Sequence, residues 1–219
     1  MFRLFIIIII GGVLFSMYKA YRKSLISLRE RFIDTYQFPE TISIKVIEKY
    51  PHLDEQQVNQ VINGLREYFH ICNIAGKTMV SMPSKVVDVA WHEFILFTKQ
   101  YEQFCNKALG RFLHHVPAEA MSTPTKAQKG IKKAWKISCY REQISPTSPE
   151  CLPIIFALDS QLEIPDGFKY LLNCKGQGDG VYCGGNIGCS SGCGGEGEGG
   201  CAGDSGDSDG CGGGGCGGD

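Results

Sequence analysis

Residues 84–117 constrain the fold more than any other part of the chain. Apolar side chains recur there at spacings of three, four, six or seven, which is typical of a buried helical face. Gly110 ends the pattern as a C-terminal glycine ends a helix, and Val116, the residue before Pro117, avoids the α region. The sequence therefore predicts a central helical segment followed by a loop. The apolar positions are Val87, Trp91, Phe94, Ile95, Tyr101, Phe104, Cys105 and Leu109.

The same segment carries candidate metal ligands. Asp88 and His92 are four residues apart and are neighbours on one helical face. A return of the chain from helix to loop brings His114 and His115 towards them. Imidazole nitrogen, carboxylate oxygen and thiolate sulfur are the ligands that zinc prefers. One interpretation of these residues is therefore a zinc site formed by His92, His114 and His115, with Asp88 or Cys105 as a further ligand.

Three other interpretations compete for these residues. The letters HEFIL lack the second histidine of HExxH, which excludes that metalloprotease motif. A cysteine protease would use Cys105 as nucleophile and His92 or His114 as base, but Cys105 stands on the apolar stripe, where free cysteines are commonly buried. In a structural interpretation, Asp88 orients His92 and the histidine pair ties the loop to backbone carbonyls. This interpretation is the best supported, and no catalytic residue is assigned.

The N-terminal residues are apolar. Residues 4–17 contain no charge and span about 21 Å as a helix, short of the ~30 Å hydrocarbon core, although flanking residues can lengthen the run. We expect a transmembrane anchor at residues 1–22, with residues 4–20 against lipid. A cleaved signal peptide and a buried core helix are the alternatives, and the letters SMYKA make a poor cleavage site.

Basic residues cluster after this apolar run. Lys19, Arg22 and Lys23 follow it, whereas only Arg3 precedes it. The positive-inside rule then places the body and the C-terminus in the cytoplasm. The chain is accordingly predicted to be a single-pass membrane protein.

The body follows as a series of helical patterns. Residues 23–40 predict a juxtamembrane helix and linker, and residues 41–173 a compact all-α bundle, because no period-two alternation occurs. A helix near residues 124–141 carries a lysine face, interpreted either as a solvated surface or as a membrane-surface contact. No nucleic-acid motif is present, and no nucleic-acid partner is expected. The face consists of Lys126, Lys129, Lys132, Lys133 and Lys136.

The C-terminal segment, residues 174–219, is of low complexity. It holds most of the chain's 28 glycines and 11 cysteines. The segment is acidic and the body is basic, and the two charges nearly cancel to give the net charge of −1. Such a composition cannot bury enough apolar surface to order the chain, so we expect a disordered tail. A flexible appendage, a soft-metal or redox-responsive thiol tail, and a substrate for thiol modification are the competing interpretations.

The letters VDxxWHxxIL, then YxxFC, then a glycine and a histidine pair before proline, stand within residues 87–117. Together with the tail, they resemble the glycine-rich domain-containing protein-like family. In that family a histidine often stands two residues after the first one, where this chain has Phe94. The resemblance implies a helical domain with a Gly/Cys-rich tail and implies no activity.

Two functions follow as expectations. The first is a membrane-anchored, non-enzymatic interaction or assembly module that binds a protein partner of unknown identity. The alternative is a metal-binding protein or metal-dependent enzyme centred on His92 and the pair His114 and His115, with zinc as the candidate metal.

Overall fold

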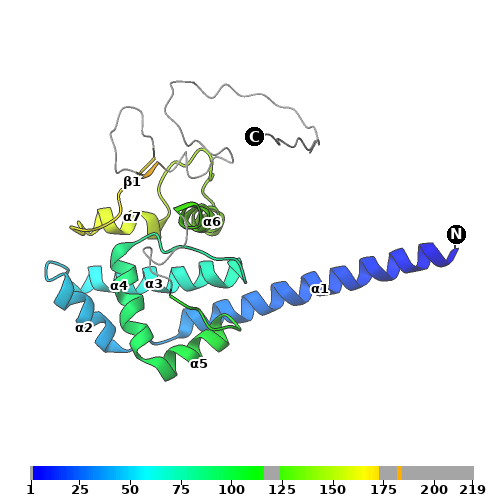
Figure 1. Ribbon diagram of the computed structural model, residues 1–219, viewed down its shortest axis with the longest axis horizontal. Helices are drawn as coiled ribbons and strands as arrows, with labels where there is room; N and C mark the ends of the chain where they lie inside the picture. Colours follow the sequence, from blue (N-terminus) through cyan, green and yellow to red (C-terminus); the bar gives the residue numbers. More distant parts are fainter. Residues whose placement is uncertain (1, 116–123, 173–181, 184–219) are drawn as a thin grey trace, which may run out of the picture.

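The computed structural model describes residues 2–115, 124–172 and 182–183 of the chain. Helices form most of this part (Figure 1). In chain order the elements are α1 (Phe2–Thr35), α2 (Glu40–Lys49), α3 (Glu55–Ala75), α4 (Lys85–Leu96), α5 (Thr98–Ala108), α6 (Pro124–Glu142), α7 (Ile154–Gln161), β1 (Tyr170–Leu171) and β2 (Tyr182–Cys183).

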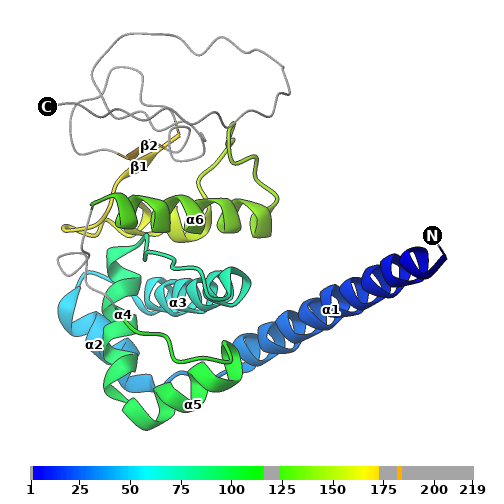
Figure 2. The ribbon, with the colours of Figure 1, turned by 45° about the vertical axis from the view of Figure 1, so that its right-hand side comes forward.

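Helix α3 is the central element of the bundle. It contacts α1, α2, α4, α6 and α7 (Figure 2). The Asp54 side chain accepts from the backbone N–H of Gln57 at 2.7 Å while Gln57 reaches back to Asp54 N–H, a capping box that fixes where α3 begins. A Cβ on Gly64 would lie 2.8 Å from Val87 Cγ2 and 2.9 Å from Leu158 Cδ2. Glycine at this position therefore allows α4 and α7 to pack closely on α3.

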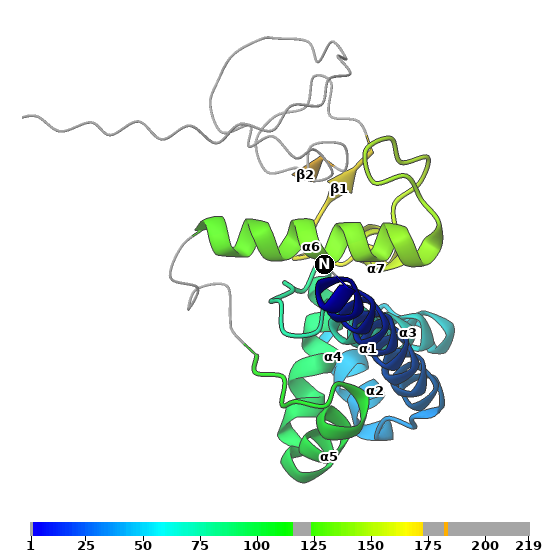
Figure 3. The same cartoon turned by 90° about the vertical axis from the view of Figure 1, so that its right-hand side faces the viewer.

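The predicted central segment is helical and buried. It forms α4 and α5, which Phe97 separates, and Gly110 at φ 66° follows the end of α5. Trp91 is only 4% exposed, and Phe94 and Phe104 lie in an aromatic cluster with Phe69. Figure 3, which looks along α1, shows α5 and α6 on opposite sides of the bundle. The stripe read from the sequence thus forms part of the core.

The prediction of an N-terminal transmembrane helix was wrong. Helix α1 is 34 residues long, yet no helix in the described part of the chain is both long and apolar enough to cross a bilayer. The physical reason is that the uncharged run of residues 4–17 is short and continues without a break into a charged segment. The single-pass membrane localisation inferred from this run, from which the cytoplasmic body and C-terminus were deduced, was wrong for the same reason.

The second half of α1 packs on the bundle instead. His70 Nε2 lies 2.8 Å from Asp34 Oδ1, and Asn73 Nδ2 donates to Ile26 O at 3.1 Å. Arg66 donates to the carbonyl oxygens of Ile33 and Tyr36. These contacts join α1 to α3, and the first half of α1 projects beyond the bundle (Figure 1).

A small parallel pair of strands adds to the helices. Tyr170 pairs with Tyr182 and Leu171 with Cys183. The all-α prediction missed this pair because two-residue strands are too short to show a period-two pattern. Apart from Tyr182–Cys183, the tail expected to be disordered from residue 174 onward lies outside the described residues.

Helix α6 presents the predicted lysine face. Lys129, Lys133 and Lys136 are exposed and Lys132 is half-buried, whereas Trp135 on the same helix is buried. The side chain of Lys126 lies outside the described ones. This exposure suits both a solvated face and a contact surface, so a role in binding stays a prediction.

A buried carboxylate on α7 holds the start of α4. Asp159 is 3% exposed. It accepts hydrogen bonds from Ser84 Oγ at 2.7 Å, from the backbone N–H groups of Lys85 at 2.7 Å and Val86 at 3.2 Å, and from Phe168 N–H at 2.8 Å. An acidic group at a helix N-terminus satisfies unpaired donors and complements the helix dipole. Asp159 thus joins α7, the start of α4 and the segment before β1.

We expect Asp159→Asn to lower the free energy of unfolding by about 3 kcal/mol, because an amide replaces one accepting oxygen with a donor that faces other donors. Urea denaturation followed by circular dichroism measures the change. Asp54→Asn is the matched control, since asparagine caps an exposed helix start nearly as well as aspartate. Equal losses in the two variants would contradict the importance of the buried carboxylate.

Candidate metal centre

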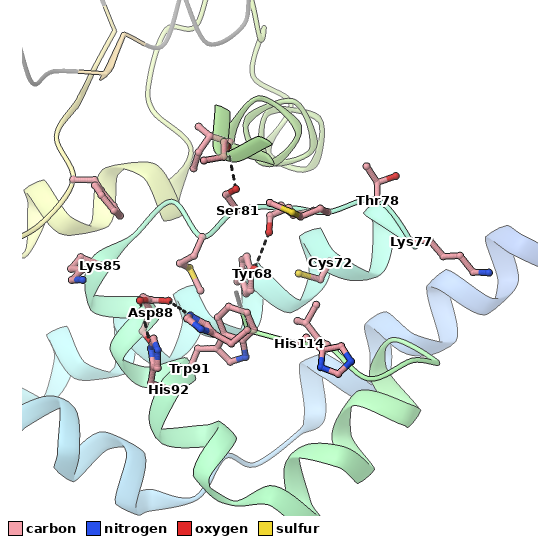
Figure 4. A pocket seen from close by; sticks show the side chains of 18 of the residues that line it. Tyr68, Cys72, Lys77, Thr78, Ser81, Lys85, Asp88, Trp91, His92 and His114 are labelled. Carbon is pink, nitrogen blue, oxygen red and sulfur yellow. Dashed lines mark hydrogen bonds and ion pairs between the residues drawn. The ribbon is translucent and has the colours of Figure 1, made fainter. Parts of the chain in front are cut away.

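A cleft of about 570 Å³ lies between α3, α4 and α6. The connection after α3 and the loop after α5 complete its wall. Tyr68, Ser81, Trp91 and His114 are among its lining residues (Figure 4). The volume is in the range of small-molecule sites.

Asp88 and His92 reach this cleft from α4. Ser84 caps α4, its hydroxyl accepting from Val87 N–H at 3.3 Å, so the register of the helix is fixed where it begins. Asp88 lies in the first turn, where a negative charge is favourable. His92 Nδ1 lies 2.8 Å from the Asp88 carbonyl oxygen and 3.5 Å from Asp88 Oδ2. The predicted i, i+4 pair is therefore present on one face.

The loop after α5 supplies His115. Trp91 Nε1 donates to Tyr101 Oη at 3.0 Å, and Tyr101 donates in turn to Leu113 O at 2.6 Å. The Trp91 and His115 rings meet edge to face with centroids 4.6 Å apart. These contacts place His115 Nε2 3.1 Å from Asp88 Oδ1.

The three side chains converge on one small volume. Each of Asp88, His92 and His115 offers a ligand atom, and these atoms lie within 4.8 Å of one another. Zinc binds nitrogen and oxygen ligands at about 2.0–2.2 Å, so neighbouring ligand atoms around a tetrahedral ion stand about 3.4 Å apart. The distances from Asp88 Oδ1 to His115 Nε2, 3.1 Å, and from Asp88 Oδ2 to His92 Nδ1, 3.5 Å, are close to that value. These two separations suit a metal ion, whereas the 4.8 Å limit on the whole group is longer, so the three side chains would have to close further around an ion.

Two details show how open the group is. The side chains of His115 and Asp88 are 14% and 21% exposed and that of His92 is 49% exposed, so the group lies at the surface of the cleft. The Asp88 carbonyl oxygen competes with an ion for His92 Nδ1. Binding through this nitrogen requires it to release its proton and the imidazole to turn slightly.

The other predicted ligands lie elsewhere. His114 lines the cleft, but its ring is 4.8 Å from the Phe112 ring and lies away from Asp88 and His92 in Figure 4. Cys105 is fully buried on α5, and this burial raises the pKa of its thiol. The structure thus brings together Asp88, His92 and His115 and leaves His114 and Cys105 outside the group.

Some lining residues were missed in the sequence. Lys85, three residues before Asp88, shares a helical face with it, a spacing that could have identified it. Arg111 lies on the same loop as His114 and His115, but no periodic pattern relates it to them. Tyr68 and Ser81 come from separate segments, and only tertiary packing brings these two to the cleft.

The described cysteines differ in burial, which predicts their reactivity. Cys72, Cys105 and Cys139 are buried and Cys151 is exposed. Burial raises the pKa of Cys72 to about 12 and that of Cys139 to about 11. The thiolate is the reactive form, so we expect the three buried thiols to react with N-ethylmaleimide at least ~100-fold more slowly than Cys151 at neutral pH. Peptide mapping by mass spectrometry, with and without urea, measures the rates.

In urea all four thiols should react alike, which is the control for reagent access. Labelling of Cys105 in the folded protein as fast as that of Cys151 would contradict this burial and would revive a nucleophilic role for Cys105.

Comparison with known proteins corrects the expected resemblance. A family model described as UCP032817-like matches residues 28–187. The resemblance to the glycine-rich domain-containing protein-like family was wrong, because it relied on a short segment and a low-complexity tail rather than on the body. Comparisons with curated proteins and with solved structures found no match. Since the matched range runs from the second half of α1 to beyond β2, the chain belongs to the UCP032817-like family.

Proposed function

We propose that this protein binds a divalent transition-metal ion through Asp88, His92 and His115. The observation that carries the proposal is the convergence of the three ligand atoms within 4.8 Å of one another, in the wall of a cleft. Asp88 supplies oxygen, and the two histidines supply nitrogen. Such a donor set suits zinc, and two histidines with one carboxylate also hold iron(II).

Three protein ligands leave coordination positions for other molecules. Catalytic zinc sites keep such a position, whereas structural sites are closed by four protein ligands. Asp88, His92 and His115 all line the cleft, so an open position would face its interior. A zinc ion bound there would lower the pKa of a bound water to about 7. This chemistry supports a metal-dependent function better than a purely structural ion.

A hydrogen-bonded group without metal is the competing interpretation. In it, Asp88 Oδ1 accepts a hydrogen bond from His115 Nε2 at 3.1 Å, and the group fixes the loop against α4. The two interpretations share their geometry and differ in metal content, so measured metal content separates them.

We expect the full-length protein to bind one more zinc ion per chain than its variants His115→Ala and Asp88→Asn, because each variant removes one of three ligands. Zinc is measured by mass spectrometry after dialysis against a defined zinc buffer. Tail cysteines are common to all variants, so the difference reports this site alone. His114→Ala is the matched control, and it should retain the ion because its ring lies outside the group.

Equal zinc content in the wild type and His115→Ala would contradict the proposal. Cobalt(II) substitution adds a second readout. Subtracting the cobalt(II) spectrum of His115→Ala from that of the wild type should leave the absorption of cobalt bound by nitrogen and oxygen. The difference spectrum should contain no thiolate band.

A second candidate function is self-association through the first half of α1. Val13, Leu14, Phe15 and Met17 are 53–64% exposed on this projecting helix. Contiguous exposed apolar surface marks interaction sites. The partner proposed for this surface is the same helix of a second copy of the chain. The interaction or assembly role expected from the sequence is proposed in this form.

The double variant Leu14→Gln/Phe15→Gln should be monomeric where the wild type is dimeric, because the substitutions remove apolar area from the contact. Light scattering after size-exclusion chromatography, over a range of concentrations, gives the mass. Leu96→Gln is the control, since Leu96 is 72% exposed on α4, away from this helix. A wild type that is monomeric at every concentration would contradict self-association.

A further inference from the structure

The cleft beside the candidate metal group is rich in positive charge. Among its described lining residues, Lys77, Lys85 and Arg111 carry a positive charge, and Asp88 carries the negative charge. The whole chain has a net charge of −1, so the cleft differs from the molecule's average. A bound divalent ion would take up the charge of Asp88 and add more positive charge. An excess of this kind attracts anions.

Arg111 is held in the cleft wall without a charged partner. Its Nε donates to Gly76 O at 2.8 Å. Within the described part of the chain it forms no ion pair, and carbonyl oxygens hold its guanidinium without neutralising it. Arg141 shows the contrast, since this half-buried arginine pairs with Glu67 and Glu30. The charge of Arg111 is thus available to a ligand.

Lys85 lies on the same helix as the metal group. Its backbone N–H is fixed by Asp159 at 2.7 Å, and its side chain lines the cleft. It precedes Asp88 by three residues, a spacing that places both on one helical face. Figure 4 shows Lys85 beside Asp88 and shows Lys77 at the far end of the cleft. Lys85 is therefore the cation next to the candidate ion.

The remaining walls are mainly apolar. Met82, Ile131 and Phe168 are partly buried apolar side chains of the lining, whereas Tyr68 and Trp91, at 1% and 4% exposed, add little accessible area. Walls of this kind, with a few polar groups, are typical of sites for small organic molecules. A bare inorganic anion would leave these side chains without contacts.

We propose that the cleft binds a small organic anion, with a phosphate-like or carboxylate group directed to the ion and the basic side chains and an apolar body against Met82, Ile131 and Phe168. The proposal rests on the metal site and assigns to it a class of ligand. Lys85 and Arg111 supply the charge that selects the anion. The apolar lining selects the body.

Isothermal titration of the full-length protein tests this ligand class with defined probes. Phenylphosphonate and benzoate carry both an anionic group and a ring, inorganic phosphate lacks the ring, and phenol lacks the charge. Phenylphosphonate or benzoate should bind at least ~10-fold more tightly than phosphate or phenol, and the tighter of the two identifies the anionic group. Lys85→Gln and Arg111→Gln should each weaken that probe ~10-fold, as expected for a hydrogen bond to a charged group.

Lys136→Gln is the matched control, because Lys136 is an exposed lysine of α6 outside the cleft. It should leave the affinity unchanged. If Arg111→Gln unfolds, Lys85→Gln still tests the proposal. This variant should fold, because Lys85 bonds to Asp159 through its backbone N–H, which the substitution leaves in place. Equal binding of phenol and phenylphosphonate, or unchanged affinity in Lys85→Gln, would overturn the assigned ligand class.

Measurements with and without zinc separate the two proposals. Zinc binding without any anion binding would refute the ligand class and leave the metal site standing. Anion binding that depends on Lys85 but is the same with and without zinc would refute the contact between anion and ion, and the metal site itself would be decided by the zinc content of His115→Ala. Tighter anion binding in the presence of zinc, lost in His115→Ala, would support both.

Discussion

The hydrogen bonds of Asp159 fix the beginning of α4, and the candidate site depends on where this helix begins. The carboxylate lies on α7 and accepts from Ser84, Lys85, Val86 and Phe168. A helix that began one residue later would turn Asp88 and His92 by about 100° away from the cleft. One buried acidic group thus helps to fix which residues of α4 face the cleft. Its burial also explains why four donors surround it, since an unpaired buried charge is costly.

A second chain of contacts positions the other half of the site. The indole of Trp91 donates to Tyr101, and Tyr101 donates to the carbonyl of Leu113 two residues before His115. These hydrogen bonds start in the core and end at the loop. The aromatic stripe therefore both fills the core and positions His115. Trp91 is buried among apolar residues and also touches the His115 ring. A rigid core supports a site better than a loop alone does.

The sequence predicted the helical body and much of the candidate group, for reasons that lie in local spacing. The i, i+4 relation of Asp88 and His92 and the period of the apolar stripe are properties of a single helix, and both are present. His115 was predicted to return towards them, but nothing local distinguished it from His114. Asp159 and Arg111 act through contacts with distant segments, which no periodicity encodes. The membrane prediction failed because it weighed the apolar run of residues 4–17 without the packing of the helix that continues it.

The ligand atoms of the candidate centre come from positions far apart in the chain. Asp88 and His115 are separated by 27 residues. An ion shared between them would act as a reversible crosslink across α4, α5 and the following loop, because it binds the folded arrangement and not the open chain. By mass action the folded state would gain RT ln(1 + [ion]/Kd). The abundance of free metal around the protein would then set how firmly this loop stays closed on the bundle.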